Sequence, residues 1–132
     1  MINIRTLKPS EFEMINGWQK EEIGYGFEFW MLPPTTFVVE VNETPVAAVS
    51  LILTNCHAIS QIENLVGNPA KRNERREAIP HLINFVCEYA KSFGSRRIYM
   101  NAYVDKLKEK YESFGFTKAS DNLSLLWKDI GG

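Results

Sequence analysis

Alternating hydrophobic and polar residues predict strands in the first half of the chain. Residues 2–7 read Ile-Asn-Ile-Arg-Thr-Leu, the period of two expected of a half-buried strand. The apolar runs 37–41 and 46–53 are separated by Asn-Glu-Thr-Pro, a turn-forming sequence, and so predict a β-hairpin. A further strand is predicted over residues 58–66. Three consecutive strands favour an antiparallel meander.

The pattern changes to a helical period after residue 78. Apolar residues recur at steps of three and four, which predicts one face of a helix that Gly94 ends. A strand over 97–103, a short helix over 105–113 and a last strand over 123–127 complete the pattern. The apolar face of the long helix comprises Ile79, Leu82, Ile83, Val86, Tyr89, Ala90 and Phe93.

The segment after the first strand contains both a helix start and residues that interrupt helices. Residues 8–11, Lys-Pro-Ser-Glu, break the strand and start a helix. Residues 17–36 contain several glycines and prolines, so we expect them to be too interrupted for a long regular helix. The same residues are rich in aromatic side chains. An aromatic-rich loop is expected to pack on the core or to line a cleft.

The order of these elements predicts the α+β class, with a sheet flanked by helices. The chain has 132 residues, of which 45% are hydrophobic, and such a chain can bury a single core. No linker or repeat interrupts it. We therefore expect one domain over residues 1–132.

Charge and cysteine content exclude several classes of function. A net charge of −1 argues against nucleic acid or an anionic membrane as the main partner. No apolar run approaches the length of a membrane span, and no secretory segment opens the chain. Cys56 and Cys87 are far apart in sequence and predict reduced thiols in a cytoplasmic protein. His57 and His81 lack partners at metal-ligand spacing, so no metal site is predicted.

Two motifs stand in order along the chain. Residues 62–69 read Ile-Glu-Asn-Leu-Val-Gly-Asn-Pro, and residues 111–116 read Tyr-Glu-Ser-Phe-Gly-Phe. Both resemble motifs of the GNAT superfamily of N-acetyltransferases, I-E-D-L-x-V-x-P and Y-E-x-x-G-F. The resemblance implies a mixed, mostly antiparallel sheet flanked by helices. It also implies transfer of an acetyl or other acyl group from acetyl-CoA, a cosubstrate, to a primary amine of a small molecule or a protein.

The resemblance also implies roles for particular residues. Glu63 corresponds to the general base of the family and Tyr111 to the tyrosine that protonates the departing thiolate. Taken without the resemblance, Glu63 is also explained as a solvent-facing residue of a strand, and Tyr111 as a core residue beside Leu107 and Phe114. The remaining expected contacts are to the cofactor: backbone of Leu65, Val66 and Gly67 to pantetheine, and Arg72, Arg75 and Arg76 to the phosphates.

The phosphate-binding loop of the family, Q/R-x-x-G-x-G/A, has lost its glycines here, since residues 72–77 read Arg-Asn-Glu-Arg-Arg-Glu. Two interpretations of this segment are open. In one, the helix starts near Pro80, and free amides there face the cleft beside the basic side chains. In the other, Asn68 caps a helix with Pro69 at its first position, which runs on past Pro80. The backbone site for the anion would then be lost.

A second function is therefore kept open, that of a non-catalytic GNAT-like module which binds a protein or a small ligand. The missing glycines favour it, as does Val104, which stands where many family members carry an asparagine. The presence of both Glu63 and Tyr111 favours the enzyme. Apolar residues of the late strands and the aromatic segment are compatible with a homodimer in either case.

Overall fold

The computed structural model describes residues 1–101, 105–120, 126 and 128–131. The chain divides into two compact units, Met1–Asn101 and Ala102–Gly132. The second unit contains the helix α3 (Asp105–Ser113), as predicted. The elements of the first unit are β1 (Ile2–Thr6), α1 (Phe12–Ile23), β2 (Thr36–Val41), β3 (Thr44–Leu53), β4 (Ile59–Gly67), α2 (Arg72–Ser92) and β5 (Arg97–Met100).

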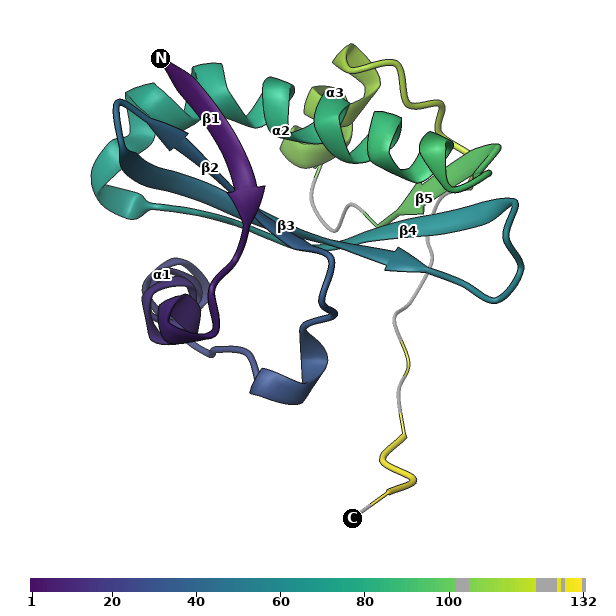
Figure 1. Ribbon diagram of the computed structural model, residues 1–132, viewed down its shortest axis with the longest axis horizontal. Coiled ribbons are helices and arrows are strands. Elements are labelled where there is room, and N and C mark those ends of the chain that lie inside the picture. The colour runs from purple at the N-terminus through teal and green to yellow at the C-terminus, as the bar shows by residue number, and fades with distance from the viewer. Residues whose placement is uncertain (102–104, 121–125, 127, 132) are drawn as a thin grey trace. The chain divides into compact units, whose positions relative to one another are not determined.

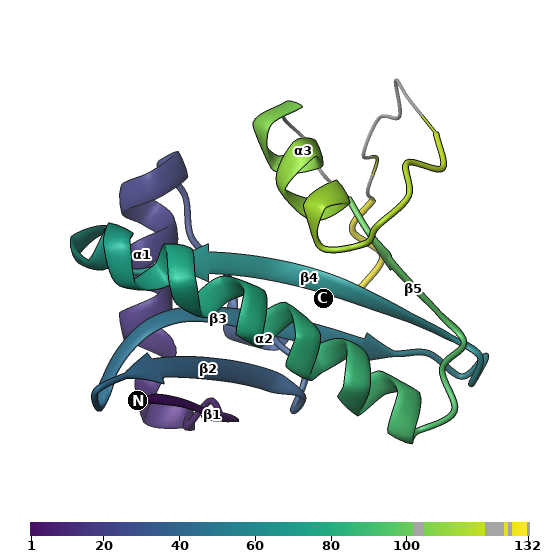
Figure 2. The ribbon, with the colours of Figure 1, turned by 90° about the horizontal axis from the view of Figure 1, so that it is seen from above.

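The sheet has five strands in the order β1-β2-β3-β4-β5, and its first three pairings are antiparallel. α2 connects β4 to β5, which pair in parallel, so the last pairing differs from the rest. Figure 2 shows α2 lying along one face of these strands. The predicted α+β class, with a mixed and mostly antiparallel sheet, is confirmed.

The two long helices lie on opposite faces of the sheet (Figure 1). On the α1 face, a buried cluster joins helix and strands. On the α2 face, the ring of Phe37 packs edge-on against Phe85 and Tyr89 of α2, with ring centroids 5.1 and 5.0 Å away. Neighbouring residues of each strand therefore bury their side chains on different faces. The cluster on the α1 face consists of Ile15, Phe27, Val38, Ala48 and Val66.

The predicted hairpin and meander are present. The turn between β2 and β3 consists of Asn42 and Glu43, which have φ angles of 49° and 69°. Positive φ at both central residues is the geometry of a type I′ turn, whose twist matches that of the flanking strands. The hairpin aligns β3 so that β4 can pair with its other edge.

The prediction for residues 17–36 was wrong at its start, because α1 continues through Gly17 and ends only at Gly24. Gly24 has a φ of 87° and closes the helix in the left-handed conformation. A glycine inside a helix costs about 1 kcal/mol relative to alanine, which tertiary packing can offset. Ile15 and Asn16, just before Gly17, are buried and supply that packing.

Asn16 also explains how the aromatic segment is held. Its Oδ1 accepts a hydrogen bond of 2.7 Å from the amide of Phe27, which is itself buried. Other aromatic residues of the segment stay at the surface: Tyr25, Phe29 and Trp30 are exposed. The loop between α1 and β2 is therefore anchored at one aromatic ring and displays the others.

The second interpretation of residues 68–80 is the correct one. The side chain of Asn68 accepts a hydrogen bond of 3.0 Å from the amide of Ala70, and Pro69 opens a short 3-10 turn. α2 follows directly and contains Pro80 in its interior. Burial of Ala78, Ile79 and Leu82 on the sheet holds the helix together across the proline.

Two predicted boundaries need correction, and part of the predicted C-terminal structure lies outside the described residues. Phe93 follows the end of α2 and is 56% exposed, so it does not belong to the buried face. β5 ends at Met100, and Asn101 is not in a strand, whereas the strand was predicted to reach residue 103. Residues 102–104, and residues 121–125 and 127 of the predicted last strand, lie outside the described residues.

Ion pairs fasten β1 to its neighbours. The guanidinium of Arg5 lies 2.7 Å from the carboxylate of Glu11, just before α1, and 3.0 Å from that of Glu40 on β2. Hydrogen bonds from Arg5 lower the pKa of Glu11, and those from Asn3 and Arg5 lower the pKa of Glu40. Arg5 therefore fixes the start of α1 against the edge of the sheet.

None of the described helices is both long enough and apolar enough to span a membrane.

Candidate functional site

The second half of β4 has one unpaired edge among the described residues. β5 pairs with β4 only from Ile59 to Ile62, whereas β4 continues to Gly67. On the other side, β3 pairs with β4 along both halves. The backbone N–H and C=O groups on the β5 side of residues 63–67 are therefore available to a ligand.

A β-bulge marks the point where the two halves of β4 meet. Ser50 pairs with Glu63 and Ala48 pairs with Val66, so that Asn64 and Leu65 both stand opposite Val49. Asn64 has a φ of 58°, in the left-handed region. A bulge bends its strand and increases the local twist. The β5 pairing ends at Ile62, so Glu63 alone separates it from the bulge.

Glu63 lies at this point, on the α1 face of the sheet. Its partner Ser50 shares a face with Ala48, two residues earlier on β3, and Ala48 belongs to the cluster under α1. The carboxylate of Glu63 is half-buried, and no described residue forms a hydrogen bond with it. Burial raises the pKa of Glu63. A carboxylate in this position is a stronger base than an exposed one.

A chain of polar groups runs from the bulge to the loop before β2. Nδ2 of Asn64 lies 3.4 Å from Oγ of Ser50, and that oxygen lies 2.9 Å from Oγ1 of Thr36. The Thr36 hydroxyl donates to the carbonyl of Pro33 at 2.8 Å. A hydroxyl has one hydrogen to donate, so Ser50 must donate to Thr36 and accept from Asn64. Ser50 and Thr36 are buried, and the chain therefore holds the bulge in one orientation.

The sequence motif identified Glu63 but not the bulge or its polar support. Asparagine is one of the few residues that adopt a positive φ readily. An asparagine inside the predicted strand, directly after Glu63, was therefore the available signal for the bulge.

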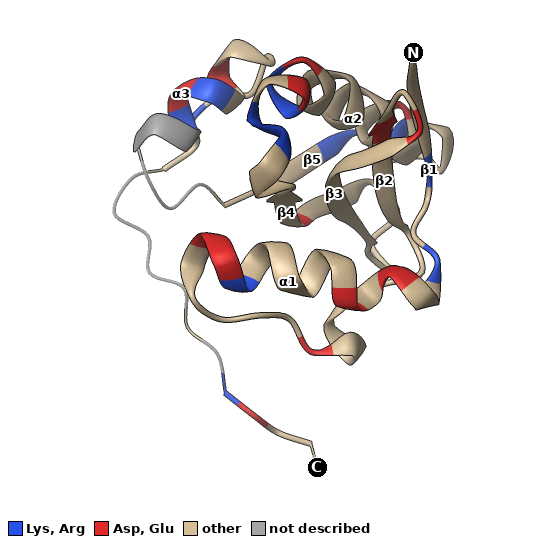
Figure 3. Ribbon diagram, turned by 90° about the vertical axis from the view of Figure 1, so that its left-hand side faces the viewer, with Lys and Arg blue, Asp and Glu red and all other residues tan. Residues whose placement is uncertain are grey.

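Basic residues gather where β4 leads into α2, and Figure 3 shows them at the start of that helix. Arg72 and Arg76 are exposed, whereas Arg75 is partly buried. No side chain caps the first turn of α2 at Lys71. Positive charge at a helix start favours an anion, while Glu74 and Glu77 in the same turns oppose it.

Arg75 also lies directly against the end of β4. A Cβ atom on Gly67 would stand 2.7 Å from Cδ and 2.6 Å from Nη1 of Arg75. Only glycine therefore leaves room for the arginine in this position. Beyond Gly67, Nη1 of Arg75 forms an ion pair of 2.9 Å with Oε1 of Glu22, near the end of α1.

No protein-family model matches this sequence, and no curated protein matches it significantly. Solved structures do match. An aminoglycoside 6′-N-acetyltransferase from Acinetobacter baumannii is 16% identical, with a TM-score of 0.70 over 99% of this chain and 100% of that one. A transcriptional regulator from Bacillus halodurans is 18% identical, with a TM-score of 0.74 over 96% of this chain and 100% of the other.

A third match is N-acetylglutamate synthase from Neisseria gonorrhoeae, in complex with coenzyme A and L-arginine. It is 16% identical, with a TM-score of 0.73, over 94% of this chain and 29% of that protein. Together with the mixed sheet and its two helical layers, these matches decide the fold.

The chain has the GNAT fold.

The resemblance inferred from the two motifs is thereby confirmed at the level of the fold. Identities of this size do not transfer an activity or a substrate. The expectation of one domain over residues 1–132, the homodimer and the cytoplasmic location stay predictions, as do the roles of the individual residues.

The residues predicted to bind the cofactor of GNAT enzymes fall together in the first unit. Leu65, Val66 and Gly67 lie in the half of β4 that has no partner on its β5 side among the described residues, and the side chain of Arg75 packs against Gly67. The free backbone edge fits an extended polar chain such as pantetheine, and the basic start of α2 fits phosphates. The glycine-free sequence and the Arg75 side chain replace the open backbone site that GNAT motifs place here.

Tyr111 lies in the second unit, among aromatic residues of the same unit. Its ring packs edge-on against Phe114 and Phe116, at centroid distances of 5.9 and 5.7 Å. Its hydroxyl is buried without a hydrogen-bond partner among the described residues. Burial raises the pKa of Tyr111. In general, a buried hydroxyl without a partner costs about 1–3 kcal/mol.

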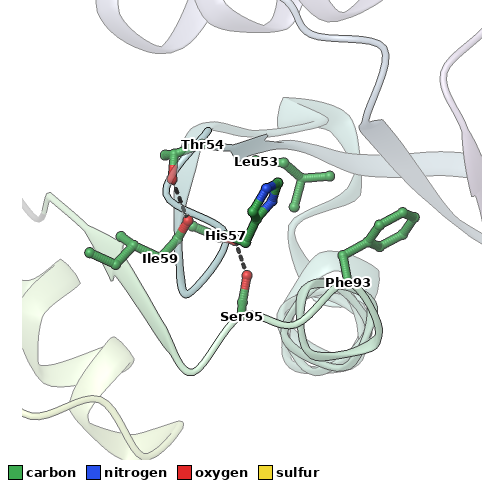
Figure 4. Close-up of a pocket in the computed structure, with 7 residues that line it drawn as sticks. Leu53, Thr54, His57, Ile59, Phe93 and Ser95 are labelled. Carbon is green, nitrogen blue, oxygen red and sulfur yellow. Dashed lines mark hydrogen bonds between the residues drawn. The ribbon is translucent and has the colours of Figure 1, made fainter.

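A pocket of about 250 Å³ lies elsewhere, at the far end of the β3–β4 hairpin (Figure 4). Its lining includes His57, Ser60 and Ser95, and the two serine hydroxyls form a hydrogen bond with each other. Ser60 shares a face of β4 with Ile62, so it points away from the face that carries Glu63. This pocket is therefore separate from the candidate site.

Among the residues that the structure describes, no group of three or more His, Cys, Asp or Glu side chains could hold a metal ion. Cys56 is exposed and Cys87 half-buried, and burial raises the pKa of the Cys87 thiol.

Proposed function

We propose that this chain is an N-acyltransferase that transfers an acetyl or other acyl group from CoA to a primary amine. The observation that supports it most is the unpaired end of β4, where backbone groups lie free beside the half-buried carboxylate of Glu63. The GNAT fold supports the same reaction class, because it is shared with N-acetyltransferases.

The unpaired edge of residues 65–67 would bind the pantetheine arm by hydrogen bonds, as a further strand would bind. Arg72, Arg75 and Arg76 would contact the phosphates by charge-assisted hydrogen bonds. When bound, acetyl-CoA supplies a thioester, an activated form of the acyl group.

Glu63 would accept the proton that a primary ammonium group must lose before it can attack. Proton removal can be direct or pass through one water molecule. Its raised pKa makes the carboxylate a better base, and its place beside the unpaired edge puts it near the proposed path of the thioester. The polar chain through Asn64 and Ser50 would keep the backbone at Glu63 in position.

Tyr111 would donate the proton that the departing thiolate takes up. A phenol is protonated at neutral pH and so has a proton to donate, although burial, which raises the pKa of Tyr111, makes it a weaker donor than an exposed phenol. Its hydroxyl has no hydrogen-bond partner among the described residues, which is compatible with this role.

The acceptor would be a small molecule or a protein that carries a primary amine. Exposed aromatic rings of the loop between α1 and β2, Tyr25, Phe29 and Trp30, offer apolar surface on the first unit. Such surface favours an acceptor with an apolar or aromatic part.

Calorimetric titration with acetyl-CoA and with CoA tests the proposal without knowledge of the acceptor. We expect saturable heat with both, and binding that weakens as salt is added, since exposed charges are screened within about 8–10 Å. The absence of heat at millimolar ligand would contradict the acyltransferase.

A non-catalytic GNAT-like module is the second candidate. One observation favours it: the Arg75 side chain packs against Gly67 and is already paired with Glu22. If acetyl-CoA gives no heat, this module becomes the better account of the chain.

A further inference from the structure

Arg75 links three elements that meet at the end of β4. It starts on α2, passes against Gly67, and ends at Glu22 of α1. Its side chain is 20% exposed and that of Glu22 is 33% exposed. The pair is therefore partly screened by water.

The path of this side chain follows from the faces of the sheet. Gly67 pairs with Ala47, which neighbours Ala48 of the α1-facing cluster and therefore points toward α2. Arg75 thus contacts Gly67 on the α2 face, yet its partner Glu22 belongs to the helix on the other face. β3 covers one edge of β4 at this point. The ion pair between Arg75 and Glu22 therefore links the two faces of the sheet beside Gly67, at the end of β4.

The other edge of β4, on the β5 side, is where the proposed function requires the cofactor to enter. A ligand whose arm lies along residues 65–67, and whose phosphates reach the start of α2, meets the Arg75 guanidinium on its way. Either the arginine blocks the ligand, or it leaves Glu22 and binds the phosphates.

Three features favour the second alternative, in which Arg75 leaves Glu22 and binds the phosphates. Gly67 has an ordinary negative φ, so its backbone does not require glycine, but the close approach of Arg75 does. Among the described residues, Arg75 has one carboxylate partner whereas Arg5 has two, and a partly exposed single pair is weak. A phosphate offers a guanidinium two parallel charge-assisted bonds, which are stronger.

We propose that Glu22 and the pyrophosphate of CoA compete for Arg75, so that Glu22 holds the arginine across the open end of β4 until the cofactor displaces it. The inference rests on the proposed function, because it takes CoA as the ligand. It assigns Glu22, on a helix outside both motifs, as a residue that sets cofactor affinity.

The test is calorimetry with CoA and with pantetheine, which has no phosphates, on the parent chain and on Glu22→Gln. Removing the competing carboxylate should tighten CoA binding about twofold to fivefold, the range expected for loss of one partly exposed ion pair. Pantetheine binding should not change. Glu21→Gln, an exposed neighbour with no ion pair among the described residues, is the matched control for charge and should change CoA binding less.

Arg75→Gln completes the cycle. It should weaken CoA binding, and Glu22→Gln should then have no further effect, because the two carboxamides no longer compete for a cation. Thermal melting of each variant verifies that it is folded.

The outcomes separate the two proposals. If the parent chain binds CoA but Glu22→Gln binds it no better than Glu21→Gln does, the competition is wrong and the acyltransferase stands. If neither the parent chain nor any variant binds CoA, the proposed function fails and the inference falls with it.

Discussion

The two halves of β4 belong to one strand but have different surroundings. Ile59–Ile62 has a strand on each side, and Ile62 is buried to 2% exposure. From Glu63 to Gly67 one side is unpaired among the described residues, a bulge interrupts the register, and the side chains Glu63 and Leu65 are half-buried.

Within the nine residues of β4, the first half contributes to the stability of the fold and the second half carries the proposed chemistry. The first half can be explained by backbone pairing and burial alone. The second half leaves backbone groups unpaired and a carboxylate partly desolvated, both of which cost free energy in the folded state. Such costs concentrate at functional sites, where the surrounding structure maintains them.

The largest expected effect is in the first half, for Ile62→Ala. The loss of a buried isoleucine side chain, with the cavity it leaves, should destabilise the protein by about 2–5 kcal/mol. Denaturant unfolding measures it, with Leu65→Ala of the second half as the comparison. If Leu65→Ala costs as much as Ile62→Ala, the two halves contribute equally to stability and the contrast fails.

Unlike Ile62→Ala, Glu63→Gln should cause little loss of stability. Its turnover with any amine acceptor should fall about 10²-fold. Burial raises the pKa of Glu63, so the folded state binds this proton more tightly than the unfolded chain does. The carboxylate therefore reduces stability at pH values above its folded pKa, and this penalty disappears as the pH falls through that value. Glu63→Gln should be at least as stable as the parent at neutral pH, and the difference should narrow in acid.

Two measurements check this: turnover against pH, and unfolding free energy against pH. If the proposed function holds, turnover of the parent protein should fall on the acid side at a pH above the ordinary glutamate pKa of about 4.3. Turnover of Glu63→Gln equal to that of the parent at every pH would remove the residue from the mechanism.

The smallest expected effect is at the bulge. Asn64→Ala places a residue with a poor left-handed preference at a φ of 58°, which should cost about 1 kcal/mol. It also removes the donor to Ser50. Asn64→Gly removes the same donor but tolerates the φ, so its stability should lie closer to that of the parent. Equal losses in both variants would assign the effect to the hydrogen bond, and equal stability in all three would make the bulge conformation unimportant.

Much of the fold could be predicted because its causes are local. The three- and four-residue period of α2, the turn at Asn42 and the alternation of β1 each depend on residues close in sequence. The cap at Asn68 and the proline after it were among the interpretations of the sequence, although they could not be chosen over the alternative. Packing of Ala78 and Ile79 on the sheet decided between them, and that contact is distant in sequence.

The sequence by itself therefore determined the class of fold, the order of elements and the place of Glu63 on a strand, because side-chain period and turn chemistry act over a few residues. Tertiary structure alone decided three further features. α1 continues through Gly17 because its neighbours are buried. Among the described residues, the second half of β4 has no partner on its β5 side because the β5 pairing ends at Met100. Arg75 meets Glu22 beside Gly67. Each depends on contacts between segments that are far apart in sequence, and the local pattern of residues does not specify such contacts.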